Sequence, residues 1–119
     1  MNNPRVVIIA VLVVVFLAAG AYLIFGRSRH NPQNLTFDVT ITGASAMQPD
    51  SLTANQGDTI TINIKSDTDG EVHLHEYDIA FDAKAGGTVT HTFKADKTCS
   101  CEIEWESTSH HLGTLTVNP

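Results

Sequence analysis

The sequence predicts an all-β domain, a Greek-key β-sandwich of about seven strands, preceded by one N-terminal hydrophobic helix. Three observations support this. Apolar and polar residues alternate with a period of two through most of residues 35–119, where no amphipathic helical stretch occurs. Turn-forming residues recur at short intervals. The β-branched residues Thr, Val and Ile dominate the stretches between the turns, as is typical of half-buried strands.

The expected strands follow from the positions of the apolar residues. Five of them have apolar residues at alternate positions, over residues 36–42, 59–65, 88–94, 99–105 and 112–117. Residues 71–81 are expected to form one bent strand or a pair of strands. Residues 46–52 are expected to be irregular because Pro49 interrupts them.

The N-terminal region is expected to anchor the chain in a membrane. Val6 to Phe25 carries no charge and no proline. At ~1.5 Å per residue this run spans ~30 Å, the thickness of a hydrocarbon core. A signal peptide ending near Ala19 is the competing interpretation. The expected organisation is an anchor or uncleaved signal over 1–26, a linker over 27–34 and a domain over 35–119.

The domain is expected to lie outside the cytoplasm, periplasmic or extracellular, at the end of a single membrane span. Residues 31–119 contain four lysines and thirteen acidic residues, a formal charge of −9. This charge excludes nucleic acid as an expected partner and favours a metal ion or a membrane or secreted protein with a basic surface. No phosphate-binding loop or Ser-His-Asp arrangement is present, so an enzyme is not expected.

Four segments resemble the cupredoxins in their order and spacing: MQPDSLTANQGDTITINIKS, HLHEYDIAF, AGGTVTHTFKAD and HHLGTLTV. A closer resemblance is to the small cupredoxin-like domains of bacterial secreted and membrane-anchored proteins, which often carry a His-x-His-x-Tyr-Asp strand. Here that strand is His73 to Asp78. The resemblance implies a cupredoxin-like sandwich over residues 35–119 and copper as cofactor.

The chain departs from the type 1 copper pattern of that family. A type 1 site needs a cysteine at the end of the penultimate strand, followed by a histidine and an axial ligand. Trp105 or a neighbour takes the place of that cysteine, and Cys101 lies about four residues, or ~13 Å, earlier. A type 1 electron-transfer centre is therefore not expected.

The main candidate metal ligands are four histidines. His73 and His75 are two residues apart on a strand, so both rings are expected on one face. His110 and His111 are expected in the closing loop beside that strand, and together the imidazoles would suit Cu(II). Asp78 or Glu76 would orient a ring or add an oxygen ligand. Polar residues at the rim of a sandwich are the competing interpretation.

A second candidate cluster combines Cys99, Cys101 and His91, which the turn at 95–98 would bring together. Two thiolates at this spacing suit Cu(I). A relaxed disulfide between them is not expected, because neighbouring strand residues aim poorly for that geometry. The competing interpretation makes Cys101 a small core residue and places Cys99 in a turn.

Three functional hypotheses follow. The first is a membrane-anchored copper protein for metal handling or delivery. The second is a metal-free interaction module with incidental histidines. The third is a thiol redox role for the Cys99/Cys101 pair.

Overall fold

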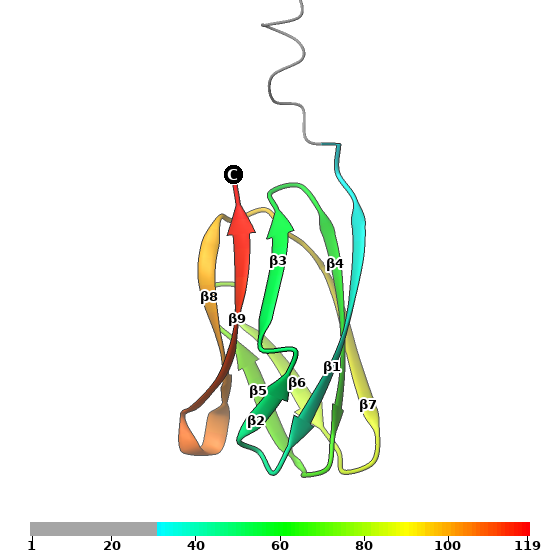
Figure 1. The fold of residues 1–119 in the computed structure, drawn as a ribbon, viewed down its shortest axis with the longest axis vertical. Helices are drawn as coiled ribbons and strands as arrows, with labels where there is room; N and C mark the ends of the chain where they lie inside the picture. Colours follow the sequence, from blue (N-terminus) through cyan, green and yellow to red (C-terminus); the bar gives the residue numbers. More distant parts are fainter. Residues whose placement is uncertain (1–30) are drawn as a thin grey trace, which may run out of the picture. The chain divides into compact units, whose positions relative to one another are not determined.

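The computed structural model describes residues 31–119, which form a β-sandwich of nine strands and one 3-10 turn (Figure 1). The strands are β1 (Asn34–Thr42), β2 (Ala46–Gln48), β3 (Ser51–Asn55), β4 (Thr59–Ser66), β5 (Gly70–Leu74), β6 (Ile79–Ala83), β7 (Thr88–Lys94), β8 (Cys99–Trp105) and β9 (His110–Asn118). The turn η1 (Glu106–Thr108) joins β8 to β9.

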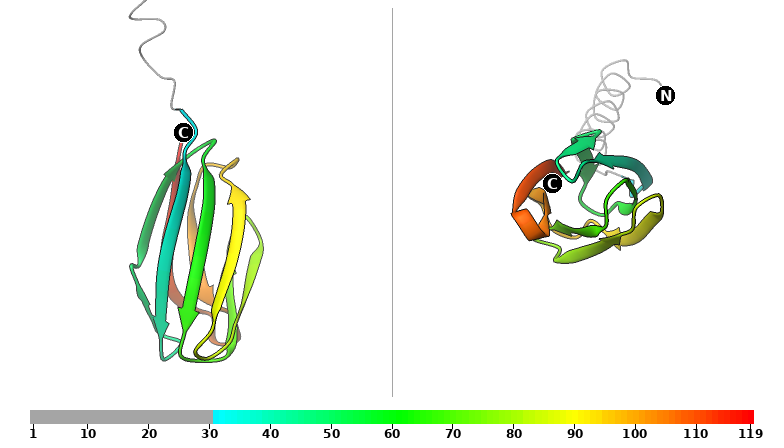
Figure 2. Two further views of the ribbon diagram at one scale, coloured as in Figure 1. Left: turned by 90° about the vertical axis from the view of Figure 1, so that its right-hand side faces the viewer. Right: turned by 90° about the horizontal axis from the view of Figure 1, so that it is seen from below.

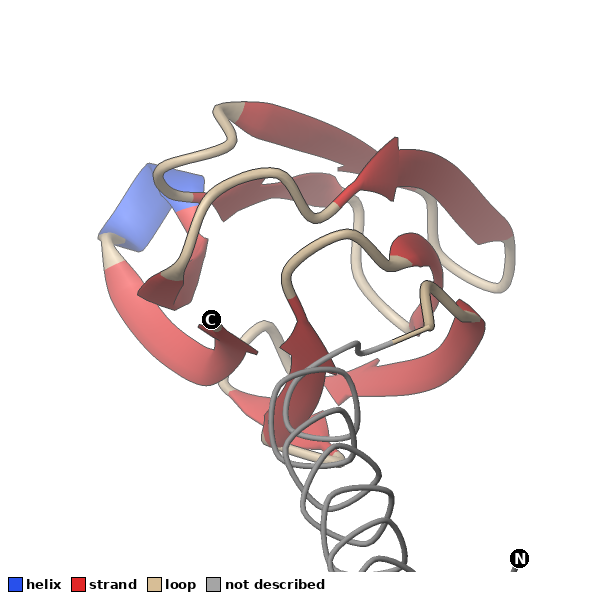
Figure 3. Ribbon diagram, turned by 90° about the horizontal axis from the view of Figure 1, so that it is seen from above, coloured by secondary structure: helices blue, strands red, loops and turns tan. Residues whose placement is uncertain are grey.

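Two sheets enclose the core. One has the order β2-β1-β4-β7, and the other has the order β3-β9-β8-β5-β6. The pairs β1/β4 and β3/β9 are parallel, while the remaining pairs are antiparallel. Viewed along the strands, the two sheets surround a common interior (Figures 2 and 3). The chain passes repeatedly between the sheets, as a Greek-key sandwich requires.

The core contains the alternate apolar residues that the sequence identified. On β4, Ile60, Ile62 and Ile64 are at most 2% exposed, and the intervening residues face outward. The same alternation buries Val39 and Ile41 on β1. Each fully buried side chain of this size contributes about 1.5–3 kcal/mol relative to an exposed one. The all-β prediction and its inward faces are confirmed.

The expected count of about seven strands was too low. Residues 46–52, expected to be irregular, contribute to two strands separated at Pro49. The second of them, β3, is fixed by a distant partner, since Leu52 pairs with Leu115 of β9. Residues 71–81 form the strand pair β5/β6, and the turn between the two strands contains Glu76 and Asp78 at positive φ.

Trp105 is a core residue. Its side chain is 3% exposed and lies against the backbone of Gly70 at the start of β5. A Cβ atom at Gly70 would overlap the indole ring. The absence of a side chain at position 70 therefore allows the indole to pack at this end of the sandwich.

No helix among residues 31–119 is long and apolar enough to cross a membrane. The anchor expected over residues 1–26 lies outside the described residues, as does the first half of the expected linker, residues 27–30. The membrane assignment therefore stays a prediction from the hydrophobic run Val6 to Phe25.

Candidate metal centre

The centre lies on the outer face of the five-stranded sheet. Val72 and Leu74 of β5 are fully buried, so the alternating residue His73 points outward. His75 follows directly after the strand, and its backbone N–H donates to the Glu102 carbonyl at 2.9 Å. The rings of His73 and His75 have centroids 4.6 Å apart. The prediction that both rings share one face is confirmed.

Glu104 of β8 joins these two histidines. It is the register partner of His73, and its neighbours Ile103 and Trp105 are buried on the inner face. Its Oε1 atom lies 2.7 Å from Nε2 of His75, and its side chain is only 13% exposed. Within residues 31–119, one ligating atom each from His73, His75 and Glu104 lie within 4.8 Å of one another.

Two further carboxylates hold the ring of His73. Nε2 lies 2.9 Å from Oδ1 of Asp78, and Nδ1 lies 3.4 Å from Oε2 of Glu106. A carboxylate on one nitrogen of a histidine fixes the ring orientation and raises the basicity of the other nitrogen, so a metal ion bound to His73 would replace one of these two carboxylate contacts. Asp78 thus has the orienting position that the sequence suggested, whereas the Glu76 backbone carbonyl accepts a hydrogen bond from Lys97.

The negative charge of this face acts on His75. The contact with the Glu104 carboxylate raises the pKa of His75, and the charges of Glu102 and Glu106 act in the same direction. Desolvation of the ring opposes them. The face therefore favours a cation on or beside the imidazole, whether a proton or a metal ion.

The His75–Glu104 contact is also compatible with a metal ion at this face. Nε2 of His75 is shielded from solvent, and despite the 2.7 Å separation it has no partner aligned for a hydrogen bond. Such shielded, unsatisfied atoms are uncommon. The two atoms lie close enough together for one cation to contact both.

His110 and His111 do not join this group. They begin strand β9 and are not in a loop, so as adjacent strand residues they point to opposite faces. His111 lies on the outer face, with Nδ1 3.7 Å from Oε1 of Glu102. His110 turns toward β1 and β2, with Nε2 2.9 Å from the Ser45 carbonyl oxygen. The expectation that all four imidazoles meet at one point is corrected.

A register shift between β8 and β9 determines which of the two histidines faces outward. Ile103 pairs with Gly113, but Glu104 pairs with His111, so Leu112 is an extra residue. Leu112 is buried, and His111 instead occupies the position opposite Glu104. This bulge brings His111 to the edge of the metal centre.

The two cysteines form a disulfide, which corrects the expectation that they would not. Both side chains lie on the inner side of β8. Their Cα atoms are 5.3 Å apart, within the range of about 4.4–6.8 Å that disulfides need and shorter than the ~6.6 Å that two residues of a fully extended strand span. Closing so short a loop stabilises the fold by only about 1.5 kcal/mol in the chain-entropy model.

The expected cluster of His91, Cys99 and Cys101 is not formed. No free cysteine occurs among the described residues. His91 lies on edge strand β7 and packs edge-on against the Phe81 ring, with centroids 4.8 Å apart. The cysteines lie on the other sheet. As joined here, their sulfurs are not thiolates and do not offer a soft copper site.

Sequence reasoning missed Glu104 and Glu106 as members of the centre. The alternation of Glu102, Glu104 and Glu106 with apolar residues is, from the sequence alone, most simply that of a solvated strand face. The signal that identifies Glu104 is the β5/β8 register, which places it opposite His73. That register joins residues about thirty positions apart in the sequence and cannot be read from local spacing.

Comparison with known proteins identifies the fold. No family model and no curated protein matches the chain. Among solved structures, the apo form of a copper-binding protein shares 11% identity, covers 76% of this chain and 92% of its own, and has a TM-score of 0.61. The metal-binding domain of the Cu(I)-exporting P-type ATPase CopA of Streptococcus pneumoniae D39 shares 14% identity, covers 77% and 92%, and has a TM-score of 0.63.

Auracyanin A, a blue copper protein from Chloroflexus aurantiacus, is also similar. It shares 17% identity, covers 71% of this chain and 99% of its own, and has a TM-score of 0.53. At these identities the similarity concerns the fold, which is cupredoxin-like. The resemblance that the sequence motifs suggested is confirmed at that level.

Proposed function

From the cupredoxin-like fold as premise, we propose that this chain binds copper outside the cytoplasm, for handling or delivery and not for type 1 electron transfer. His73, His75 and Glu104 would hold the ion. The observation that carries the proposal is the solvent-shielded Nε2 of His75, 2.7 Å from Oε1 of Glu104 without an aligned hydrogen bond. The copper-binding neighbours with the same fold support the choice of metal.

The donor set favours Cu(II). Two imidazoles and a carboxylate are borderline to hard ligands, and Cu(II) leads the divalent ions in affinity for such sites. The soft thiolate that a type 1 centre requires is lacking, because Cys99 and Cys101 are joined and Trp105 fills the core at the end of β8. Copper bound here would supply a cationic centre for ligand exchange.

The position of the centre suits transfer of the metal. The side chain of His75 is 40% exposed, and the centre lies on an open sheet surface that a second protein can approach. The carboxylates of Asp78, Glu102 and Glu106 surround it. Their charge attracts the cation and a partner with a basic surface, and a ligand from that partner can enter the open coordination positions.

The N-terminal run from Val6 to Phe25 supports a placement at a membrane, with the domain on the extracytoplasmic side. No residue arrangement in the described domain suggests catalysis, so we propose a binding protein and not an enzyme. A membrane anchor would keep the metal centre close to membrane-bound donors or acceptors and raise their effective concentration.

The test is calorimetric titration of the full-length protein, in detergent micelles, with Cu(II) in a buffer containing a weak competing chelator. We expect one saturable site, and His75→Ala should weaken it at least about tenfold because it removes a central ligand. His110→Ala is the matched control, since His110 turns away to the Ser45 carbonyl, and it should leave the affinity unchanged. Equal losses in both variants, or no saturable site, would instead favour the metal-free interaction module.

A further inference from the structure

The Cys99–Cys101 disulfide has an asymmetric setting. Cys99, the first residue of β8, is partly exposed, whereas Cys101 is 1% exposed and belongs to the core. Cys99 lies at the same end of the sandwich as the C-terminus, since it pairs with Val117 (Figure 1). A thiolate arriving from solvent therefore reaches the sulfur of Cys99 first.

The disulfide adds little constraint to the folded domain. It joins residues separated by one position, and short loops gain least from cross-linking. The register of β8 is already fixed by ladder pairing, with Cys99 opposite Val117 and Cys101 opposite Leu115. The cross-link therefore duplicates a constraint that the β8/β9 hydrogen-bond ladder already provides, and a structural role does not account for it.

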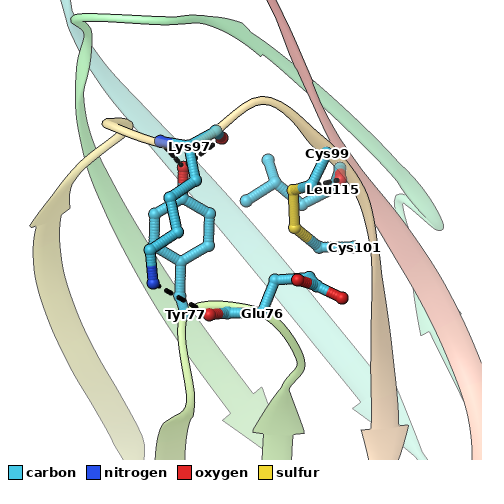
Figure 4. Close-up of a disulfide and its surroundings, with 6 residues drawn as sticks. All are labelled: Glu76, Tyr77, Lys97, Cys99, Cys101 and Leu115. Carbon is cyan, nitrogen blue, oxygen red and sulfur yellow. Dashed lines mark hydrogen bonds between the residues drawn. A yellow bond between two sulfur atoms is a disulfide. The ribbon is translucent and has the colours of Figure 1, made fainter.

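The segment that precedes the disulfide is held by other contacts. Figure 4 shows Tyr77 and Lys97 beside the two cysteines. The Tyr77 hydroxyl donates to the Lys97 carbonyl at 2.6 Å and accepts from the Lys97 N–H at 3.0 Å. The Ala95 N–H donates to the Asp58 carbonyl at 2.8 Å. Opening the disulfide leaves these anchors in place.

The fold can also accommodate both cysteines as reduced thiols. Sγ of Cys99 lies 3.9 Å from the Leu115 carbonyl oxygen, so a Cys99 thiol has an acceptor nearby. Cys101 lies among buried apolar residues, where a neutral thiol is favoured over a thiolate. Reduction therefore yields a buried thiol at Cys101 and a partly exposed thiol at Cys99.

We propose that Cys99 and Cys101 form a redox-active pair that exchanges with a dithiol of another protein. A thiolate of the partner attacks Sγ of Cys99, a mixed disulfide forms, the Cys99–Cys101 bond breaks, and Cys101 takes up a proton. The second thiolate of the partner then attacks its own mixed-disulfide sulfur and releases Cys99, which takes up another proton. Two electrons pass to this chain, and the partner leaves with a disulfide.

This exchange site is separate from the copper centre. The disulfide lies on the inner side of β8, whereas Glu104 of the same strand faces outward. The two proposals can therefore fail independently, and His75→Ala should leave the redox behaviour of the cysteines unchanged.

The first test equilibrates the full-length protein, in detergent micelles, with glutathione buffers of graded ratio and labels free thiols with a mass-tagged maleimide. We expect one rapid label per folded chain, at Cys99, and a second label at Cys101 once the labelled protein is unfolded, at glutathione ratios that leave the far-UV circular dichroism and Trp105 fluorescence of the oxidised protein unchanged. Labelling that appears only when urea unfolds the domain would show a structural disulfide and overturn the proposal.

The second test compares Cys101→Ser, which leaves the accessible sulfur, with Cys99→Ser, which leaves the buried one. We expect glutathione disulfide to modify Cys101→Ser at least about tenfold faster, because exposure and thiolate character control reactivity. Equal rates would overturn the assignment of Cys99 as the exchanging sulfur. If a variant fails to fold, the titration of the unaltered protein still decides the proposal.

Discussion

The two faces of the five-stranded sheet carry different chemistry, although the same strands build both. On β5 and β8 the inner face presents Val72, Leu74, Ile103 and Trp105 to the core, while the outer face presents imidazoles and carboxylates. A period of two assigns each residue to one face or the other. Residues that stabilise the fold and residues that can bind an ion therefore alternate along one strand. A substitution on the inner face should mainly affect stability, and one on the outer face should mainly affect ion binding.

The largest effect is expected from the inner face. Gly70→Ala places a Cβ atom in steric overlap with the edge of the Trp105 ring, so the indole or the β5 backbone must move. We expect a loss of about 2 kcal/mol and a Tm lower by about 10 °C, measured by thermal unfolding of the metal-free protein. Gly87→Ala is the matched control, since its nearest non-neighbour atom is the Lys84 carbonyl oxygen at 3.4 Å. Similar Tm values for both variants would contradict the packing argument.

An intermediate effect is expected from the outer face. Glu104→Gln removes the charge of the carboxylate closest to His75 and should weaken Cu(II) binding about tenfold, equivalent to about 1.4 kcal/mol. Glu102→Gln removes an equal charge from the same face of β8 but contacts His111 only at 3.7 Å. Its effect on calorimetric affinity should stay within about threefold, from the weaker field alone. A larger loss of affinity in Glu102→Gln than in Glu104→Gln would indicate that the metal centre lies nearer to β9.

The smallest effect concerns pH and tests whether the outer face also contributes to the stability of the fold. The pKa of His75 is raised in the folded state by Glu104, so protonated His75 stabilises the fold fully below its unfolded pKa of about 6.5. This contribution is lost as pH rises through the raised folded pKa. Between pH 6 and pH 9 the metal-free protein should lose about 1–3 °C in Tm more than His75→Gln loses. Parallel pH profiles for the two proteins would contradict the His75–Glu104 interaction.

Local sequence patterns correctly predicted the features that depend only on neighbouring residues in the chain. Alternation identified the inward faces of β1, β4 and β8, and the spacing of His73 and His75 placed both rings on one side. What local spacing did not contain was pairing between distant segments. The β3/β9 ladder turned a segment interrupted by proline into a strand, and the β5/β8 register brought Glu104 to His75.

Two errors came from misjudging the local backbone conformation. His110 and His111 were expected in a loop, where neighbouring side chains can converge, but β9 begins at His110 and separates them. The cysteines were expected to stand apart along an extended strand, but the Cα separation of 5.3 Å allows them to join. In both places the local backbone conformation decided the outcome.

The extra residue Leu112 also bears on how such a surface can change between related chains. If β9 kept the same residues but formed no bulge, uninterrupted pairing would set Leu112 opposite Glu104 and His111 opposite Trp105, so the imidazole would leave the acidic face and an apolar side chain would replace it. The ion-binding character of the surface therefore depends on this bulge, while the core ladder from Cys99 to Ile103 would keep its partners without it.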